Sequence, residues 1–380
     1  MTALRHQLLA LLASVTPLIA VAQRPVAATV PVWTGKPDLV LGKEDDEHET
    51  FSFVSGMAVL RDGRLVVADW KDHRVRVFSP SGQYQFDIGR EGGGPGEFRQ
   101  PCCMRVLDDG TLLVGDPQAS RFNLYRVEAS RAVSIGTIVT RGAARLDPLA
   151  PALSRLAVNR FAMLSSNDAG DCRREHEVQH MDSTGKPLTN VKIATPPEDS
   201  LDIYVSRMQF RGGRGCAYHN VAYGSRFLLA LAPNGGFARA VSGRYDIEWR
   251  SADGKVRARL SKDPEPPAPL TSNERARQSQ TIDDVRNAYK GPRRVVVPDG
   301  RPPIAALKFD ELNRLWVVRS TPATSLRVAD VYDASGRLLA RATWPAELPL
   351  EGSSVVMSTA LYIATTDTSD VRHITRIRFR

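Results

Sequence analysis

Two stretches of this chain match each other at a fixed spacing, which limits the possible fold more than any other feature. Residues 56–89 match residues 103–136. The matched pairs each lie 47 positions apart: Asp62 and Asp109, Asp69 and Asp116, Arg74 and Arg121, Phe78 and Tyr125, Gly89 and Gly136. A constant offset over this many pairs indicates an internal repeat, so we expect a fold built from copies of one small unit.

Each copy is expected to form four short strands separated by turns. In the first copy the strands cover 56–60, 64–68, 74–78 and 84–88. Asp62-Gly63 and Pro80-Ser81-Gly82 have the composition of tight turns, and the strand segments are rich in Val, Leu, Ile, Phe and Tyr. Four antiparallel strands in a repeat of about 40–47 residues are typical of one blade of a β-propeller.

Weaker copies continue along the chain and bring the number of units to six. The third covers 153–191, with strands around Leu153–Val158, Phe161–Leu164, Glu177–Met181 and Leu188–Ile193. The others cover 216–242, with a turn at Pro233-Asn234-Gly235, then 304–344 and 353–380. The sixth unit ends after its third strand, and residues 37–42 resemble a fourth strand that has no blade. We therefore expect 37–42 to close the ring as the outer strand of the sixth blade.

The pattern resembles the NHL-repeat group of six-bladed β-propellers, of the secreted bacterial type. The resemblance rests on Gly92–Pro101, Asp62–Phe78 and Gly82–Gly89; it is close over 37–136 and partial beyond. It implies an all-β fold, a six-bladed β-propeller, to which the residues themselves add an N-terminal strand closing the last blade and one helical insertion. It implies little about function, because propellers serve many functions.

The glycine-rich run 88–101 is interpreted as a connector rather than a phosphate-binding loop. It joins the outer strand of the first unit to the inner strand of the second, where sharp turns favour glycine at positive φ. A phosphate-binding P-loop needs Gly-Lys-Ser/Thr leading into a helix. Here Glu97 and Phe98 follow the glycines, and no helix is expected.

One segment, about 254–293, departs from the repeat. Lys262–Pro269 is proline-rich, and Thr271 and Glu274 form a capping-box pattern. A helix near 272–289 would place Ile282, Val285 and Tyr289 on one stripe. This helix is interpreted either as a lid over one face of the propeller or as a decoration of the blade edges.

The N-terminal segment has the pattern of a secretory signal peptide. Residues 1–7 carry one positive charge, an apolar run follows, and Ala20-Val21-Ala22 fits a cleavage site. We expect 1–22 to be a signal peptide, 23–36 a linker and 37–380 the propeller. The mature protein is expected to be secreted or periplasmic, without a transmembrane segment.

The cysteines are expected to form one or two disulfides after export. Cys102, Cys103, Cys172 and Cys216 map to one face of the ring and allow three pairings. A bond between the neighbours Cys102 and Cys103 is the least favourable choice, because adjacent residues fit disulfide geometry poorly. Metal binding is the alternative, but the spacing lacks C-x-x-C.

A formal net charge of +9 permits binding to acidic partners. The arginines are spread over the chain without a block of five basic residues, so nucleic acid is not an expected partner.

The face that carries the cysteines also holds the candidate ligand-binding residues. Trp70 and His73 have no copies in the second unit, which favours a role in binding. Arg74 and Arg121 recur with Asp69 and Asp116, so they also fit a structural role within the blades. His219 is a further candidate, near the start of the fourth unit's inner strand.

His176 and His180, near Asp168, Asp171 and Glu175, form the best local metal-like cluster. We favour solvated loop residues over a metal site here, and assign no metal ligand and no catalytic residue.

The functional hypothesis is a secreted binding module for a protein, peptide or glycan. Propellers similar to this one include calcium-dependent lactonases and zinc-dependent amidating lyases. The alternative is therefore a metal-dependent hydrolase or lyase centred on the channel, and only that alternative would require Ca²⁺ or Zn²⁺. No cofactor is otherwise expected, and we expect a monomer.

Overall fold

The computed structural model describes most of the chain between residues 29 and 380. The described residues are 29–139, 156–165, 172–182, 184, 186–194, 196, 203–210, 213–263, 267–288, 298–322, 325–350 and 352–380. Within them, only the backbone is described for 156–165, 172–175, 203–210, 213–220, 285, 286 and 288. The predicted signal peptide, 1–22, lies outside the described residues.

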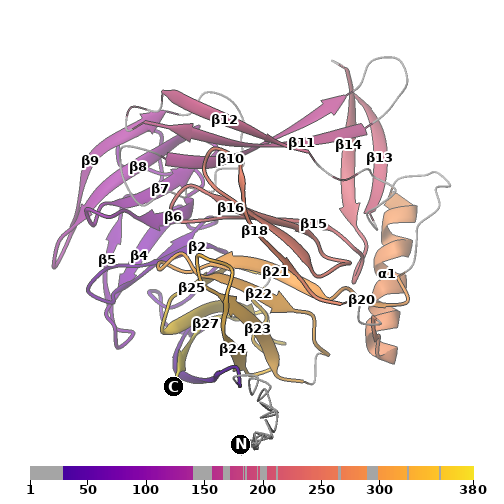
Figure 1. The fold of residues 1–380 in the computed structure, drawn as a ribbon. Coiled ribbons are helices and arrows are strands. Elements are labelled where there is room, and N and C mark those ends of the chain that lie inside the picture. The colour runs from indigo at the N-terminus through magenta and orange to yellow at the C-terminus, as the bar shows by residue number, and fades with distance from the viewer. Residues whose placement is uncertain are drawn as a thin grey trace, which may run out of the picture.

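The first two blades each contain four antiparallel strands, as the repeat predicts (Figure 1). Blade one consists of β2 (Val54–Val59), β3 (Leu65–Asp69), β4 (Arg74–Phe78) and β5 (Tyr84–Ile88). Blade two consists of β6 (Cys102–Val106), β7 (Leu112–Asp116), β8 (Arg121–Val127) and β9 (Ala132–Val139). We call the strands of a blade a to d, from the inner strand to the outer one.

The turns between strands a and b follow from the Asp-Gly pairs. Gly63 and Gly110 have φ values of 85° and 86°, which residues with a side chain rarely adopt. The aspartates before them accept hydrogen bonds from the backbone two residues on, Asp62 from Arg64 N (3.1 Å) and Asp109 from Thr111 N (2.9 Å). Each Asp-Gly pair thus fixes the hairpin whose strands the blade requires.

The glycine-rich run is the connector between blades one and two, as expected. Gly89, Gly92 and Gly96 all have positive φ, and no helix follows. Phe98 lies fully buried between the two blades, in the core they share. The run therefore provides sharp turns and one apolar anchor.

The third blade differs from the prediction. The structure describes three strands, β10 (Leu156–Ser165), β11 (Cys172–Met181) and β12 (Pro187–Ile193). The two strands expected at 153–158 and 161–164 are not separate, because β10 pairs with β11 without a break along its whole length. Residues 153–155 lie outside the described chain.

The fourth blade begins later than expected. It consists of β15 (Phe227–Leu231), β16 (Phe237–Val241), β17 (Asp246–Arg250) and β18 (Val256–Ser261). Pro233-Asn234-Gly235 lies in its first turn, with Gly235 at φ 83°. Residues 213–220 form β14 (Gly213–Asn220), which pairs with β13 (Ile203–Phe210) in a separate hairpin. Cys216 and His219 therefore lie on this hairpin and not at the start of an inner strand.

The insertion is shorter than predicted and contains the expected helix. Because β18 is the outer strand of blade four, the insertion starts after Ser261 rather than near 254. The helix α1 spans Ser272–Ala288, and a short pair, β19 (Ala268–Pro269) and β20 (Gly300–Arg301), flanks it.

The capping box at the start of α1 is confirmed. Thr271 N donates to Glu274 Oε2 (2.8 Å), and Glu274 N donates to Thr271 Oγ1 (3.3 Å). The predicted stripe is buried at Ile282, whereas the side chain of Val285 and residue Tyr289 lie outside the description. None of the described helices combines the length and apolarity that crossing a bilayer requires.

The last two blades close the ring through the N-terminal strand. Blade five consists of β21 (Ile304–Phe309), β22 (Leu315–Arg319), β23 (Arg327–Tyr332) and β24 (Leu338–Trp344). Blade six consists of β25 (Ser354–Val356), β26 (Ala360–Thr366) and β27 (Arg372–Phe379), completed by β1 (Val32–Leu41).

The closing strand extends beyond the predicted 37–42 into the expected linker. Residues 35–41 pair antiparallel with β27, as expected of an outer strand of blade six. Residues 32–34 pair in parallel with β24, the outer strand of blade five. Asp38 also accepts hydrogen bonds from Arg376 Nε (2.7 Å), so charge and backbone pairing join the two ends of the ring.

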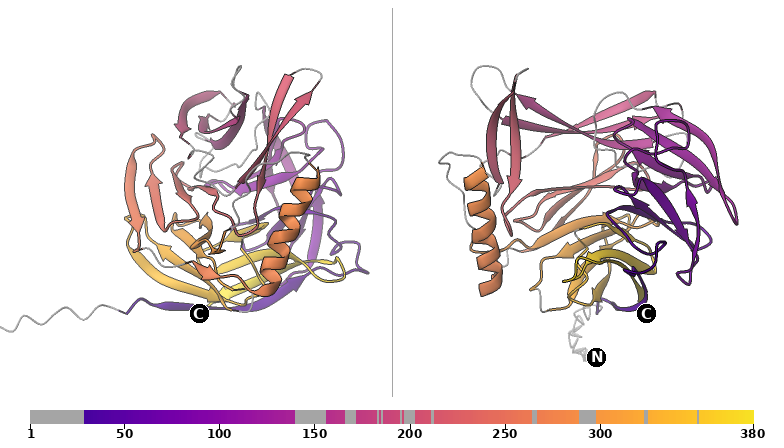
Figure 2. Two further views of the ribbon diagram at one scale, coloured as in Figure 1. Left: turned by 90° about the vertical axis from the view of Figure 1, so that its right-hand side faces the viewer. Right: turned by 180° about the vertical axis from the view of Figure 1, so that it is seen from behind.

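The hydrophobic core lies between the blades. Trp316 and Trp344 are buried between blades five and six, and Trp249 between blades four and five. Both faces of each middle strand are covered, which explains why β3 and β7 are buried at every position. The chain is thus a six-bladed β-propeller, with α1 and the β13–β14 hairpin on one side of it (Figure 1; Figure 2, right).

Candidate functional site

One face of the propeller carries the connections between strands d and a and between strands b and c, and we call it the loop face. The hairpin β13–β14 and helix α1 both lie in d-to-a connections, so they rise from this face. The predicted cysteines and ligand-binding residues of blades one and two also lie on it.

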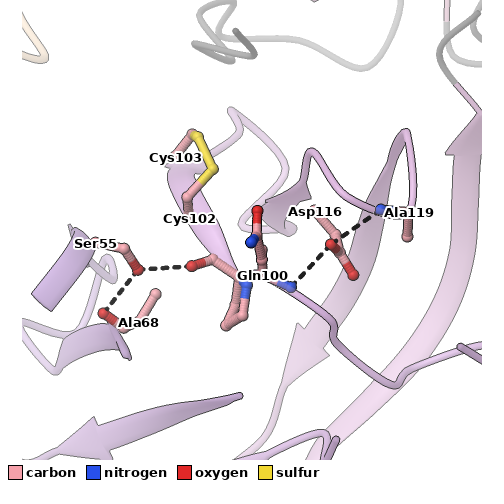
Figure 3. The surroundings of a disulfide bond; sticks show 8 residues. Ser55, Ala68, Gln100, Cys102, Cys103, Asp116 and Ala119 are labelled. Carbon is pink, nitrogen blue, oxygen red and sulfur yellow. Dashed lines mark hydrogen bonds between the residues drawn. A yellow bond between two sulfur atoms is a disulfide. The ribbon is translucent and has the colours of Figure 1, made fainter. Parts of the chain in front are cut away.

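Two buried aspartates hold the loop face together. Asp69 accepts hydrogen bonds from the backbone N–H groups of Ser52 (2.7 Å) and Phe53 (2.9 Å). Asp116 does the same for Arg99 and Gln100 and also accepts from Ala119 N (3.2 Å; Figure 3). Both side chains are fully buried. Each carboxylate therefore accepts hydrogen bonds from the N–H groups just before an inner strand, in place of water. The repeated aspartates are structural.

The repeated arginines also have internal partners. The guanidinium of Arg121 donates to the carbonyl oxygens of Gly93 (2.9 Å), Gly94 (2.7 Å) and Glu97 (2.8 Å), which fixes the glycine-rich connector. Arg74 lies 3.5 Å from Asp87 and 3.6 Å from Asp72. Neither guanidinium is directed to an open binding surface.

The carboxylate of Asp72 belongs to the same framework. Burial alone would raise the pKa of Asp72, but hydrogen bonds involving Ser52 and Arg76 outweigh burial and lower it. Arg76 is fully buried and donates to Asp72 Oδ2 (2.6 Å). Asp72 therefore stays ionised and serves as a fixed partner of a buried arginine.

His73 is held by the neighbouring connector. Its φ is 53°, and the residue 47 positions on, Ser120, has a φ of 50°, so this turn requires the left-handed conformation in both blades. His73 Nδ1 lies 2.6 Å from the carbonyl oxygen of Arg99, which makes Nδ1 the donor. Nε2 is 3.9 Å from Glu91 Oε1 at the surface.

Trp70 forms an exposed aromatic pair with Phe53. Their ring centroids are 5.2 Å apart in an edge-to-face arrangement, and Trp70 N donates to Phe53 O (3.1 Å). The exposed fractions are 41 % for Trp70 and 37 % for Phe53. The guanidinium of Arg372, at the start of β27 in blade six, lies 5.8 Å from the centre of the Phe53 ring.

The structure joins Cys102 and Cys103 in a disulfide, the pairing that the sequence argument considered least favourable (Figure 3). The reason lies in a β-bulge. The register between β6 and β7 shifts between Cys102 and Met104, and Cys103 has a φ of 44°, which brings the two side chains together. Gly115 on β7 packs beside this bond, and a Cβ there would lie 3.5 Å from the sulfur of Cys102, an ordinary contact distance.

The other candidates lie elsewhere. Cys172 is the first residue of β11, and Cys216 and His219 lie on β14, all with only their backbone described. His180 is fully buried, and its Nε2 lies 2.9 Å from Gly235 O, which is a structural contact rather than solvated loop geometry. Among the described residues, no three His, Cys, Asp or Glu side chains are arranged to hold a metal ion.

The structure also shows a polar cluster that the sequence did not indicate. Asp330 is fully buried on β23 and accepts hydrogen bonds from Lys262 Nζ (2.6 Å) and Tyr245 OH (2.9 Å). The Tyr245 hydroxyl also lies 2.9 Å from that of Tyr332. Burial, together with the charge of Asp330, raises the pKa of Tyr245, so the phenol stays neutral and donates. This cluster joins the third strand of blade five to the start of the third strand and the end of the outer strand of blade four.

Comparison with known proteins agrees with this architecture. The model of a family of unknown function, DUF5128, described as a 6-bladed beta-propeller, matches residues 51–112. The chain belongs to the six-bladed β-propellers. The family match covers blade one and the start of blade two. No curated protein matches the chain.

Solved structures similar to this propeller share little sequence with it. A DUF4221 member from Bacteroides vulgatus has 11 % identity and a TM-score of 0.49, covering 91 % of this chain and 98 % of its own. A Bacteroides fragilis protein described as exported has 11 % identity and a TM-score of 0.48, covering 93 % and 100 %. Virginiamycin B lyase from Staphylococcus aureus has 8 % identity and a TM-score of 0.41, covering 90 % and 99 %. Likenesses at this level carry no argument about function.

Proposed function

We propose that this protein is an exported propeller that binds a peptide or glycan on its loop face, over Phe53 and Trp70. The observation that carries the proposal is the exposure of this aromatic pair. Large aromatic side chains dominate binding hot spots, because they bury much apolar area with little loss of conformational entropy. Two of them in contact on one face are more than the fold requires.

The internal repeat provides an independent argument. The positions 47 residues after Phe53 and Trp70 are occupied by Gln100 and Pro117, so the blade forms without aromatic residues there. By contrast, Asp69 and Asp116 recur, and the carboxylates of both accept hydrogen bonds from backbone N–H groups. The aromatic pair is specific to blade one, and a fold built from copies has no structural need of it.

Arg372 adds a cation beside the pair. Its guanidinium lies near the Phe53 ring, and Arg372 comes from blade six rather than blade one. A ligand stacked on the rings would therefore also meet a hydrogen-bond donor from the neighbouring blade. Such a mixture of aromatic surface and a fork-shaped donor suits a sugar chain or a peptide backbone.

The experiment compares Phe53→Ala and Trp70→Ala with the wild-type protein on peptide and glycan arrays, followed by calorimetry on the ligands found. Loss of a hot-spot aromatic weakens binding by about 2 kcal/mol or more, so we expect each variant to bind more than roughly tenfold more weakly. Leu312→Ala is the matched control: Leu312 is 60 % exposed but follows β21, on the opposite face. Wild-type affinity in both aromatic variants would refute this site.

Export is the second part of the proposal, and the N-terminal sequence pattern supports it. Expression of the full chain in a bacterial host with an outer membrane tests it. A mature protein in the periplasm or medium that begins at Gln23 is the expected result. An uncleaved protein retained in the cytoplasm contradicts it.

The metal-dependent hydrolase or lyase remains the alternative. It requires acidic or histidine side chains that converge from several inner strands on a Ca²⁺ or Zn²⁺ ion. Native mass spectrometry of the protein purified without chelator distinguishes the two. A stoichiometric metal that chelation removes would favour the enzyme and would direct the search to lactone and ester substrates.

A further inference from the structure

In four blades, we compare the residue of inner strand a that forms the second-last pair with strand b. These four residues are equivalent positions in the repeat and lie at the same level. The residues at this level are Ala58, Arg105, Ala230 and Lys308, which pair with Val66, Leu113, Ala238 and Trp316. Ala58 and Ala230 are buried in the cores between blades. The fold is therefore satisfied by alanine at this level, and Arg105 of blade two is not required to complete the blade.

Arg105 lies on the inner strand of blade two and is half-buried. Its neighbours Met104 and Val106 pack into the core shared with blade one, so the Arg105 side chain leaves the opposite side of the strand. An inner strand borders the central channel of a propeller. Arg105 therefore extends from a strand that borders the channel, on the side of blade three and two residues after the Cys102–Cys103 disulfide at the loop-face end.

Arg105 makes no hydrogen bond or ion pair with any residue in the described part of the chain. Buried arginines elsewhere in the described chain have such partners. Arg64 donates to Asp62 and Glu128 O, Arg76 to Asp72, and Arg376 to Asp38 and Pro80 O. Arg105 differs from them because it has no such partner among the described residues, and its half-buried guanidinium keeps part of its contact with water.

The electrostatic surroundings of Arg105 are mixed. Burial lowers the pKa of Arg105, and the carboxylates of Asp108 and Glu311 oppose this shift. Neither carboxylate is within ion-pair distance of it. Glu311 accepts hydrogen bonds from Ser358 N (2.8 and 3.1 Å), and Asp108 lies at the exposed turn after β6. Lys308 adds a positive charge from blade five, which stands opposite blade two in a ring of six.

We infer that Arg105 anchors an anion-binding site in the central channel, which takes the carboxylate or phosphate group of a small ligand. The guanidinium offers parallel N–H donors that match two oxygens of either group, and the ligand would pair with donors that no residue in the described chain engages. This site does not depend on Phe53 and Trp70, so it stands or falls separately from the proposed peptide or glycan site.

Thermal unfolding of the full mature chain tests the inference, with inorganic phosphate and acetate as probes and sodium chloride at equal ionic strength as reference. At least one probe is expected to raise the melting temperature of the wild-type protein above the chloride reference. Arg105→Gln is expected to abolish this increase, and Arg105→Lys to retain part of it. Arg61→Gln is the matched control, because Arg61 is exposed at the a–b turn of blade one. A response to phosphate alone, acetate alone or both identifies the ligand group.

A second measurement needs no variant. Phenylglyoxal modifies accessible arginines, and mass spectrometry locates the modified residues in the wild-type protein. We expect the active probe to slow modification of Arg105 at least severalfold while leaving Arg61 unaffected. The inference is overturned if neither probe protects Arg105 or shifts the wild-type melting temperature. It is equally overturned if Arg105→Gln folds and keeps the full shift.

Discussion

At the scale of single residues, recurrence in the repeat separates structural from unassigned side chains. Asp69 and Asp116 occupy the same position in two blades and make the same backbone hydrogen bonds. Trp70 and Arg105 have Pro117 and Ala58 as their counterparts, and neither side chain is required to complete a blade. In a repeated fold, the equivalent residue of another blade thus shows whether a side chain is needed for the fold. A fold without repeats does not allow this comparison.

Replacement of Asp116 by alanine is expected to destabilise the protein by about 2–4 kcal/mol, because three backbone N–H groups lose a buried, charged acceptor. Denaturant unfolding measures this loss. Asp109→Ala is the control: its side chain is exposed and caps a single N–H, so we expect a cost of about 1 kcal/mol or less. Equal costs for the two variants would contradict the bracing role.

At the scale of elements, blades four and five are joined by a buried ionic cluster between β23 and the residues that flank β17 and β18. Asp330 on β23 meets Lys262, which follows β18, and Tyr245, which precedes β17. Burial pushes the pKa of Asp330 up, but Lys262 and Tyr245 outweigh burial, and the pKa lies below its usual value of 3.8. The ionised carboxylate is therefore favoured by folding.

This shift gives a pH dependence with a defined sign. Because the pKa of Asp330 is lower in the folded than in the unfolded protein, its contribution to stability is complete above about pH 4 and is lost as the pH falls below that value. Asp330→Asn should lose this dependence and about 3 kcal/mol of stability at neutral pH. Unfolding curves between pH 2 and 7 measure both. The exposed Asp246→Asn should keep the wild-type profile, and an Asp330→Asn profile parallel to the wild-type one would argue against the cluster.

The sequence predicted elements well where local chemistry determines them. The Asp-Gly turns, the capping box at Thr271 and the closing role of 37–42 depend on neighbouring residues or on the repeat. The β13–β14 hairpin was missed because it lies outside the blades, although part of it, 216–220, resembles the start of the fourth unit. The bond between Cys102 and Cys103 depends on a bulge, and Phe53 lies in a loop without periodicity, so their roles depend on tertiary structure.

At the scale of the whole molecule, the ring depends on β1. Its residues pair with β24 and β27, and Leu41 is buried against blade one. Lys36, Pro37 and Leu39 face strand β27, and the carboxylate of Asp38 bridges Arg376 and Arg378. Without this strand, blade six would expose the edge of β27.

A chain that begins at Gly42 is expected to melt roughly 10 °C or more below one that begins at Val30, because it loses a whole strand of the closed ring. A synthetic peptide of residues 31–42 added in excess should restore much of the difference. Calorimetry of the three samples measures the effect. Equal melting temperatures for the two proteins would show that closure by β1 contributes little.

The pairing of β1 with β27 also constrains the order of events during folding. Leu39 pairs with Arg376, so the first described strand and the last one must meet before blade six exists. During synthesis or export, β1 therefore has no pairing partner in blade six until nearly the whole chain has emerged. Contacts of such long sequence separation form slowly, and the ring can close only as a late step. Over that interval the unpaired strand is open to misassembly or to protection by a chaperone.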